Sequence, residues 1–154
     1  MNIKNLNYKI SLAVTILFFL SSGIVYFVKN KHYSVDNFLN KANSYFINEN
    51  FLQSARYYRK LISMGFVDEN VYINISNSLI KLGDYKKAKD YLKEALNNHP
   101  SSELYYLLGY TYYAKLQISF LHEDAEESIK YLQKSIEMDK KNKLSYRLIG
   151  QIYE

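Results

Sequence analysis

The sequence predicts an all-α protein, in which one N-terminal transmembrane helix is followed by an α-solenoid of helix-turn-helix hairpins. Three observations predict this class. Residues 10–28 form an uncharged apolar run. Residues 71–100 divide into two amphipathic helical halves around a Leu-Gly-Asp-Tyr break. The same spacing of apolar residues recurs before and after that stretch. Because one such hairpin cannot bury its apolar faces alone, repeated hairpins are expected to stack on one another.

The N-terminal segment is predicted to be a signal anchor. Residues 1–9 form a basic tail, and residues 10–28 are 19 positions without a charge. At 1.5 Å per residue, a helix of that length spans roughly the ~30 Å hydrocarbon core of a bilayer. A cleaved signal peptide is the alternative, with the small residues 21–23 as its cleavage site. The apolar run continues past that site to Val28, which favours an uncleaved anchor.

The orientation of this anchor rests on a weaker signal. Basic residues stand on both sides of the apolar run, so the positive-inside comparison is nearly balanced. A short basic tail that stays in the cytoplasm predicts a single-pass protein of the bacterial cytoplasmic membrane, with its repeats in the periplasm. The linker, residues 29–34, is short, so the repeats are expected to lie close to the bilayer. A cytoplasm-facing domain and a secreted domain released by cleavage remain alternatives.

Ten landmarks in the central stretch form a pattern of alternating large and small residues. They are Tyr72, Ile75, Ser76, Leu79, Gly83, Tyr85, Ala88, Leu92, Ala95 and Pro100. In this order they resemble the tetratricopeptide repeat, a helical hairpin of ~34 residues. Gly83 is predicted to end the first helix and Asp84 to cap the second. Ala88 and Ala95 are expected to be small because the paired helices press together there.

The resemblance extends over residues 35–154, which we divide into three repeats and a terminal helix. The repeats are residues 35–68, 69–101 and 102–142, and the final helix is residues 143–154. The third repeat carries a seven-residue insertion that is too apolar for a free loop, so two lengthened helices are expected to pack together. The final helix is either a cap or the start of a further repeat. The break of the first repeat, Asn48-Glu49-Asn50, lacks the glycine.

The charge distribution argues against a nucleic-acid partner. The chain has 20 Lys and Arg, 15 Asp and Glu, and a pI near 9.1. Four of the basic residues flank the apolar run, so 16 basic and all 15 acidic residues lie in the repeats. A region that is almost neutral overall has no single-signed field to hold phosphates.

No pattern in the sequence indicates an enzyme or a cofactor. Cysteine is absent, which excludes a thiol nucleophile or thiolate metal site. His122-Glu123-Asp124 is the only cluster of histidine with carboxylates, and adjacent residues of a helix point apart. This cluster is therefore expected to be a charged helix start. We predict a protein without catalytic activity, metal or cofactor.

The resemblance implies a concave groove lined by the first helix of each repeat. The residues that it places there are Leu39, Asn43, Phe46, Asn70, Ile73, Asn77, Ile80, Tyr106, Tyr110, Tyr113 and Arg147. The three tyrosines recur at three- and four-residue steps and so share one helix face. They are expected either to contact a protein partner or to pack beneath the inserted helices.

The groove is not expected to bind chaperone C-termini. The carboxylate clamp of this family needs three cations, but Leu39, Glu103 and Leu107 stand at those positions. The resemblance instead implies a membrane-tethered scaffold that recruits or assembles a cell-envelope complex, such as a translocon, outer-membrane assembly or flagellar-motor complex. A regulatory adaptor is the alternative, and the apolar pair Phe120 and Leu121 also allows a homo-oligomer.

Overall fold

The computed structural model describes residues 14, 17–18, 20–21, 23–25 and 34–154. The predicted tail, the linker up to residue 33 and about half of the predicted transmembrane helix lie outside the described residues. The chain divides into two units, Met1–Asn37 and Phe38–Glu154. In the first unit, the described residues are helical, and those of the apolar run include Leu17, Phe18 and Val25, which are 65–69% exposed. Within the described residues, no helix is both long and apolar enough to cross a membrane.

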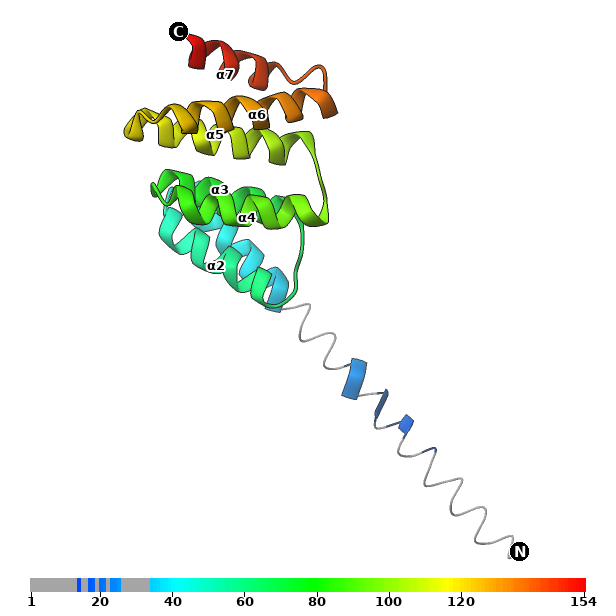
Figure 1. Ribbon diagram of the computed structural model, residues 1–154. Coiled ribbons are helices and arrows are strands. Elements are labelled where there is room, and N and C mark those ends of the chain that lie inside the picture. The colour runs from blue at the N-terminus through cyan, green and yellow to red at the C-terminus, as the bar shows by residue number, and fades with distance from the viewer. Residues whose placement is uncertain (1–13, 15–16, 19, 22, 26–33) are drawn as a thin grey trace, which may run out of the picture. The chain divides into compact units, whose positions relative to one another are not determined.

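The second unit is a stack of helical hairpins (Figure 1). Residues 34–47 are helical, and six labelled helices follow: α2 (Phe51–Ser63), α3 (Glu69–Lys81), α4 (Tyr85–Asn98), α5 (Ser102–Ser119), α6 (His122–Met138) and α7 (Lys143–Tyr153). Each labelled helix contacts the next one in the chain, as do the pairs α3–α5 and α5–α7. The predicted helical solenoid is therefore confirmed.

Ser34, the last residue of the predicted linker, is helical together with residues 35–47. Residues 29–36 contain neither glycine nor proline, so nothing in their backbone chemistry keeps Ser34 out of a helix.

The helix ends follow the predicted local chemistry. Gly83 has φ of +74°, and the side chain of Asp84 accepts a hydrogen bond from the backbone N–H of Lys87. Both predictions for this break are confirmed. Gly65, which follows α2 one residue before the position that Pro100 holds in the next repeat, has φ of +79°. Its N–H donates to the carbonyl of Ile62, and that of Phe66 donates to the carbonyl of Leu61, which closes the helix end in a Schellman motif.

Small side chains lie where the two helices of a hairpin press together. Ala88 and Ala95 are at most 3% exposed, as predicted. Ser128 holds the place of Ala88 in the third hairpin, and its hydroxyl donates to the carbonyl of Gly109 at 2.8 Å. The close approach of α5 and α6 therefore gives the buried serine a partner.

The insertion lengthens the third hairpin, as predicted. Helices α5 and α6 have 18 and 17 residues, against 13 and 14 in α3 and α4. They lie side by side along their length (Figure 1). The main core lies deeper in the stack, where Tyr72, Leu92, Leu104 and Leu108 are at most 2% exposed.

Candidate binding surface

The first helix of each hairpin carries the predicted contact residues. These helices are residues 34–47, α3, α5 and α7, of which α5 contacts both α3 and α7. We call the exposed and partly exposed residues among these predictions the first-helix face. They are Leu39, Asn43, Phe46, Asn70, Asn77, Tyr106, Tyr110, Tyr113 and Arg147.

The N-terminal part of this face is held by residues of α2. The hydroxyl of Tyr58, which is fully buried, donates to the side-chain oxygen of Asn43 at 2.6 Å. Burial raises the pKa of Tyr58, and a hydrogen bond with Asn74 opposes that rise. The ring of Phe46 packs edge-on against Phe51 at 5.8 Å between centroids. The hydroxyl of Tyr58 thus fixes the orientation of the side-chain amide of Asn43.

Helix α3 divides the predicted residues between surface and core. Asn70 is exposed and Asn77 is partly exposed. Ile73 and Ile80 are each only 8% exposed, and Ile73 belongs to the main core cluster with Leu92 and Leu107. The two isoleucines therefore lie in the core beneath the surface of α3, and the two asparagines remain on that surface.

Helix α5 presents a ladder of three partly exposed tyrosines. The ring centroids of Tyr106 and Tyr110 are 6.3 Å apart with planes at 24°, and those of Tyr110 and Tyr113 are 6.4 Å apart with planes at 35°. We call these three residues the tyrosine ladder. Burial raises the pKa of Tyr106 most, and the nearby charge of Arg147 lowers it. The cation of α7 therefore lies within electrostatic reach of the ladder.

A different set of tyrosines packs against helix α6. Tyr105 and Tyr112 both stack on Tyr131 of α6, with centroids 6.5 and 5.6 Å apart. Burial is the main cause that raises the pKa of Tyr112 to about 12. The aromatic contacts with α6 are thus made by the tyrosines that neighbour the ladder in sequence, and the ladder occupies another side of α5.

The positions of the carboxylate clamp lack cations in the folded chain as well. Leu107 is buried at 7% exposure, Leu39 is partly buried, and Glu103 is exposed with a negative charge. A terminal carboxylate placed there would lose its hydration without gaining a positive partner.

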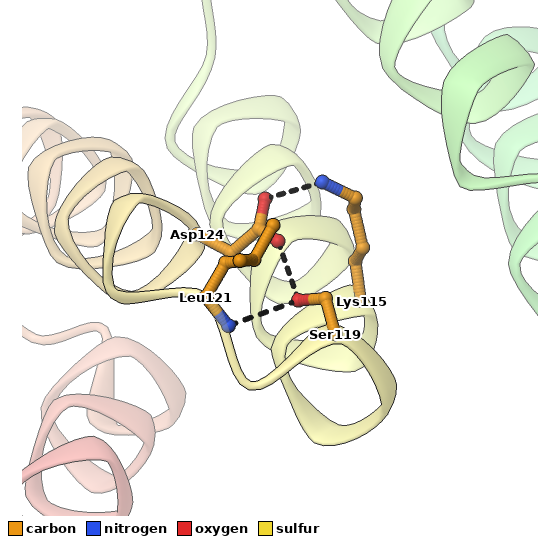
Figure 2. A network of polar contacts seen from close by, with 4 residues as sticks. All are labelled: Lys115, Ser119, Leu121 and Asp124. Atoms are coloured by element: carbon orange, nitrogen blue, oxygen red, sulfur yellow. Dashed lines mark hydrogen bonds and ion pairs between the residues drawn. The ribbon is translucent and has the colours of Figure 1, made fainter.

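The histidine–carboxylate cluster forms a helix start. His122 opens α6, and its Nε2 lies 3.2 Å from Glu126 on the next turn. Asp124 instead turns inward, where its carboxylate accepts hydrogen bonds from Lys115 and Ser119 at 2.8 and 2.6 Å (Figure 2). Over the described part of the chain, no group of three or more His, Asp or Glu side chains could hold a metal ion.

Sequence reasoning missed an aromatic and basic cluster at the N-terminal end of the second unit. The ring of Tyr57 lies against Phe38 and Tyr45, with centroids 6.0 and 5.5 Å apart, and the Nζ of Lys41 lies 5.9 Å from its centre. Cations interleaved with tyrosines in residues 56–60, Arg-Tyr-Tyr-Arg-Lys, were the available signal.

Comparison with known proteins identifies the repeat and the fold. The tetratricopeptide repeat family matches residues 69–101. The sol locus transcriptional repressor of Clostridium acetobutylicum is 32% identical over 91 residues, which are 59% of this chain and 26% of that protein. The chain thus spans about a quarter of the length of this curated relative.

Two solved structures share the architecture. The second TPR domain of human RPAP3, in complex with the HSP70 peptide SGPTIEEVD, superposes with a TM-score of 0.70 at 14% identity and covers 80% of this chain and 98% of that one. The Arabidopsis OM64 TPR domain gives a TM-score of 0.69 at 11% identity, over 80% and 97%. At these identities the likeness shows the fold.

Proposed function

From the tetratricopeptide repeat at residues 69–101, set in a solenoid with the fold of tetratricopeptide repeat domains, we propose that this chain is a membrane-tethered protein-protein interaction module. Its first-helix face binds an extended segment of another protein. The module recruits or assembles a complex of the cell envelope, such as a translocon, an outer-membrane assembly complex or a flagellar-motor complex.

The observation that carries this proposal is the partly exposed tyrosine ladder of α5. Tyrosine offers a large, rigid contact area with a polar tip, which suits the energetic centre of a protein interface. We infer that the amides of Asn43 and Asn77, both partly exposed on first helices, pair with the backbone of the bound segment. The tyrosine ladder supplies the contact area, and the hydrogen bonds of the amides fix the orientation of the bound segment.

The chemistry of the face also limits the partner. The RPAP3 domain is described in complex with an HSP70 peptide. This chain has Leu39, Glu103 and Leu107 where a carboxylate clamp needs cations. The partner is therefore an internal segment with apolar and hydrogen-bonding side chains, bound without its terminal carboxylate.

The tether is supported by the sequence of residues 10–28, which carries no charge over a length sufficient for a bilayer. With the short basic tail kept in the cytoplasm, the repeats stand on the periplasmic side. The alternative is a cytoplasm-facing regulatory adaptor, which the name of the Clostridium relative favours. A secreted form released by cleavage is the third arrangement.

Membrane orientation is tested with a single cysteine, because the native chain has none. Lys86→Cys, exposed on α4, is labelled in intact cells with a membrane-impermeant maleimide. Labelling in intact cells supports the periplasmic form. Labelling only after lysis indicates the cytoplasm-facing adaptor, and recovery of the labelled protein in the medium indicates the secreted form.

The binding surface is tested by photo-crosslinking in cells. A photoreactive residue replaces Tyr106, Tyr110 or Asn77, and the matched control replaces Tyr153, which is 74% exposed on α7. We expect one crosslinked envelope protein from the first three positions and none from Tyr153. Tyr110→Ala is expected to weaken that complex at least about 10-fold.

Two outcomes contradict this assignment. If the photoreactive residues on the tyrosine ladder give no crosslink while a detergent pulldown still recovers a partner, the partner binds elsewhere on the chain. A probe at Phe120, which is 84% exposed, that crosslinks to a second copy of this chain would instead support a homo-oligomer through the tip of the third hairpin.

A further inference from the structure

We propose that the N-terminal end of the second unit binds the anionic phospholipid headgroups of the membrane in which the chain is tethered. The surface is a pocket of about 340 Å³ lined by Phe38, Gln53, Arg56, Tyr57 and Lys60, with Lys41 beside it. We call these six residues the basic pocket. The inference rests on the proposed tether, and it concerns a surface distinct from the first-helix face.

The charge of the basic pocket is not balanced by ion pairs. Lys41, Arg56 and Lys60 are exposed, and among the described residues none of them forms an ion pair. By contrast, Lys87, Lys115 and Lys130 each pair with a carboxylate. The unpaired cations are therefore available to an external anion.

The charge is also unevenly distributed along the repeats. Residues 35–67 carry four basic side chains against Asp36 and Glu49, whereas residues 68–154 carry 12 basic against 13 acidic side chains. The first hairpin is thus positive while the remainder is slightly negative. In a negatively charged surface field, such a domain is drawn to the membrane by its first hairpin.

The geometry of the basic pocket fits a phosphate at an interface. Arg56 and Lys60 are four residues apart on α2, so their side chains share one face of the helix. Guanidinium groups bind phosphate oxygens in bidentate fashion. The ring of Tyr57 lies against those of Phe38 and Tyr45 beside these cations. Aromatic rings with a polar edge favour the headgroup region, where one end is apolar and the other is hydrated.

The distance along the chain allows this contact. Phe38 lies ten residues after Val28, the end of the apolar run. Ten residues reach at most about 35 Å when extended and about 15 Å when helical. The basic pocket is therefore within reach of the leaflet beside which the apolar run ends, and the tether keeps it at high local concentration there.

The test uses the full chain with one reporter cysteine. Gln53→Cys places a fluorophore on the wall of the basic pocket, and the protein is reconstituted into nanodiscs of phosphatidylcholine with or without phosphatidylglycerol. A small fraction of lipid carries a quencher on its headgroup. We expect quenching to rise when phosphatidylglycerol is present and to fall again with added salt.

Two matched variants identify the cations. The double substitution Arg56→Gln and Lys60→Gln is expected to reduce the rise in quenching caused by phosphatidylglycerol at least about 10-fold. The double substitution Lys86→Gln and Lys93→Gln removes the same charge from exposed positions on α4. It is expected to leave the rise in quenching unchanged. Equal loss in both pairs would show a general charge effect and overturn the assignment to the basic pocket.

The other outcomes separate this inference from the proposed function. A full chain that does not float with liposomes overturns the tether and this inference together. A chain that floats, but whose quenching is the same in both lipids, overturns this inference alone. If inorganic phosphate shifts the fluorophore equally in neutral nanodiscs, the basic pocket binds a soluble anion and the membrane assignment is wrong.

Discussion

The Nζ of Lys115 donates to the carboxylate of Asp124 at 2.8 Å, across the turn between α5 and α6 (Figure 2). Asp124 is 3% exposed, and Ser119 donates a second hydrogen bond to the same carboxylate. Burial alone would raise the pKa of Asp124, but the hydrogen bonds of Lys115 and Ser119 outweigh it and hold the pKa below its usual value. The tip of α5 is thereby fixed to the start of α6.

Asp124→Asn is expected to lower the free energy of unfolding by about 2 kcal/mol at neutral pH, because it removes the partner of Lys115. That side chain is 36% exposed and can turn to water, so the loss stays below that of a fully buried pair. A folded-state pKa that is depressed contributes stability above the unfolded value near 4, and this is lost as the pH falls through the folded pKa. The thermal unfolding midpoints of the native protein and of Asp124→Asn should therefore approach each other as the pH falls below about 4. A difference that stays constant from pH 7 to pH 3 would contradict this account.

Gly109→Ala is expected to destabilise the protein by about 1–3 kcal/mol. An added Cβ would lie 2.7 Å from the Cγ of Leu132 and 3.1 Å from the carbonyl oxygen of Ser128, so α5 and α6 would have to separate. Gly150→Ala is the control, because Gly150 is exposed on α7 and no described atom outside its own turn of helix lies within 4 Å of the added Cβ. That change should stabilise the helix by about 1 kcal/mol. Urea denaturation measures both, and the same sign for the two would refute the packing argument.

Glu49→Gly is expected to stabilise the protein by about 1 kcal/mol. Glu49 occupies the place that Gly83 holds one repeat later, and it has φ of +57°, a conformation that side chains with a Cβ disfavour. The N–H of Glu49 donates to the carbonyl of Phe46, so the backbone of this turn is already closed. Gly83→Ala should cost a similar amount at the equivalent turn. Thermal unfolding of both variants checks the pair, and a lower midpoint for Glu49→Gly would contradict the prediction.

Ser76→Ala is expected to leave the stability unchanged or raise it by up to about 1 kcal/mol. The hydroxyl of Ser76 is fully buried and has no hydrogen-bond partner among the residues that the structure describes, so its removal relieves an unsatisfied group. Ser54→Ala is the contrast, because its hydroxyl donates to the carbonyl of Ala42 at 3.1 Å. That variant should lose about 1–2 kcal/mol. Equal losses in chemical denaturation would indicate that Ser76 is satisfied in solution.

The sequence alone was sufficient for the features that depend on neighbours a few residues apart. The turn at Gly83 and the cap at Asp84 each follow from the conformation and hydrogen bonding of one short segment. The small residues Ala88 and Ala95 follow from a repeat period that the whole stack must share.

The tertiary structure decided which side chains remain on the surface. The resemblance to the tetratricopeptide repeat placed Ile73 with Asn77 in the groove, yet stacking against the next hairpin buries the isoleucine and leaves the asparagine partly exposed. Tyr106 and Tyr105 are adjacent in sequence, but only Tyr105 stacks on Tyr131. Burial depends on which residues arrive from hairpins about 30 residues away, and a helix with apolar side chains on several faces does not specify that by its own period.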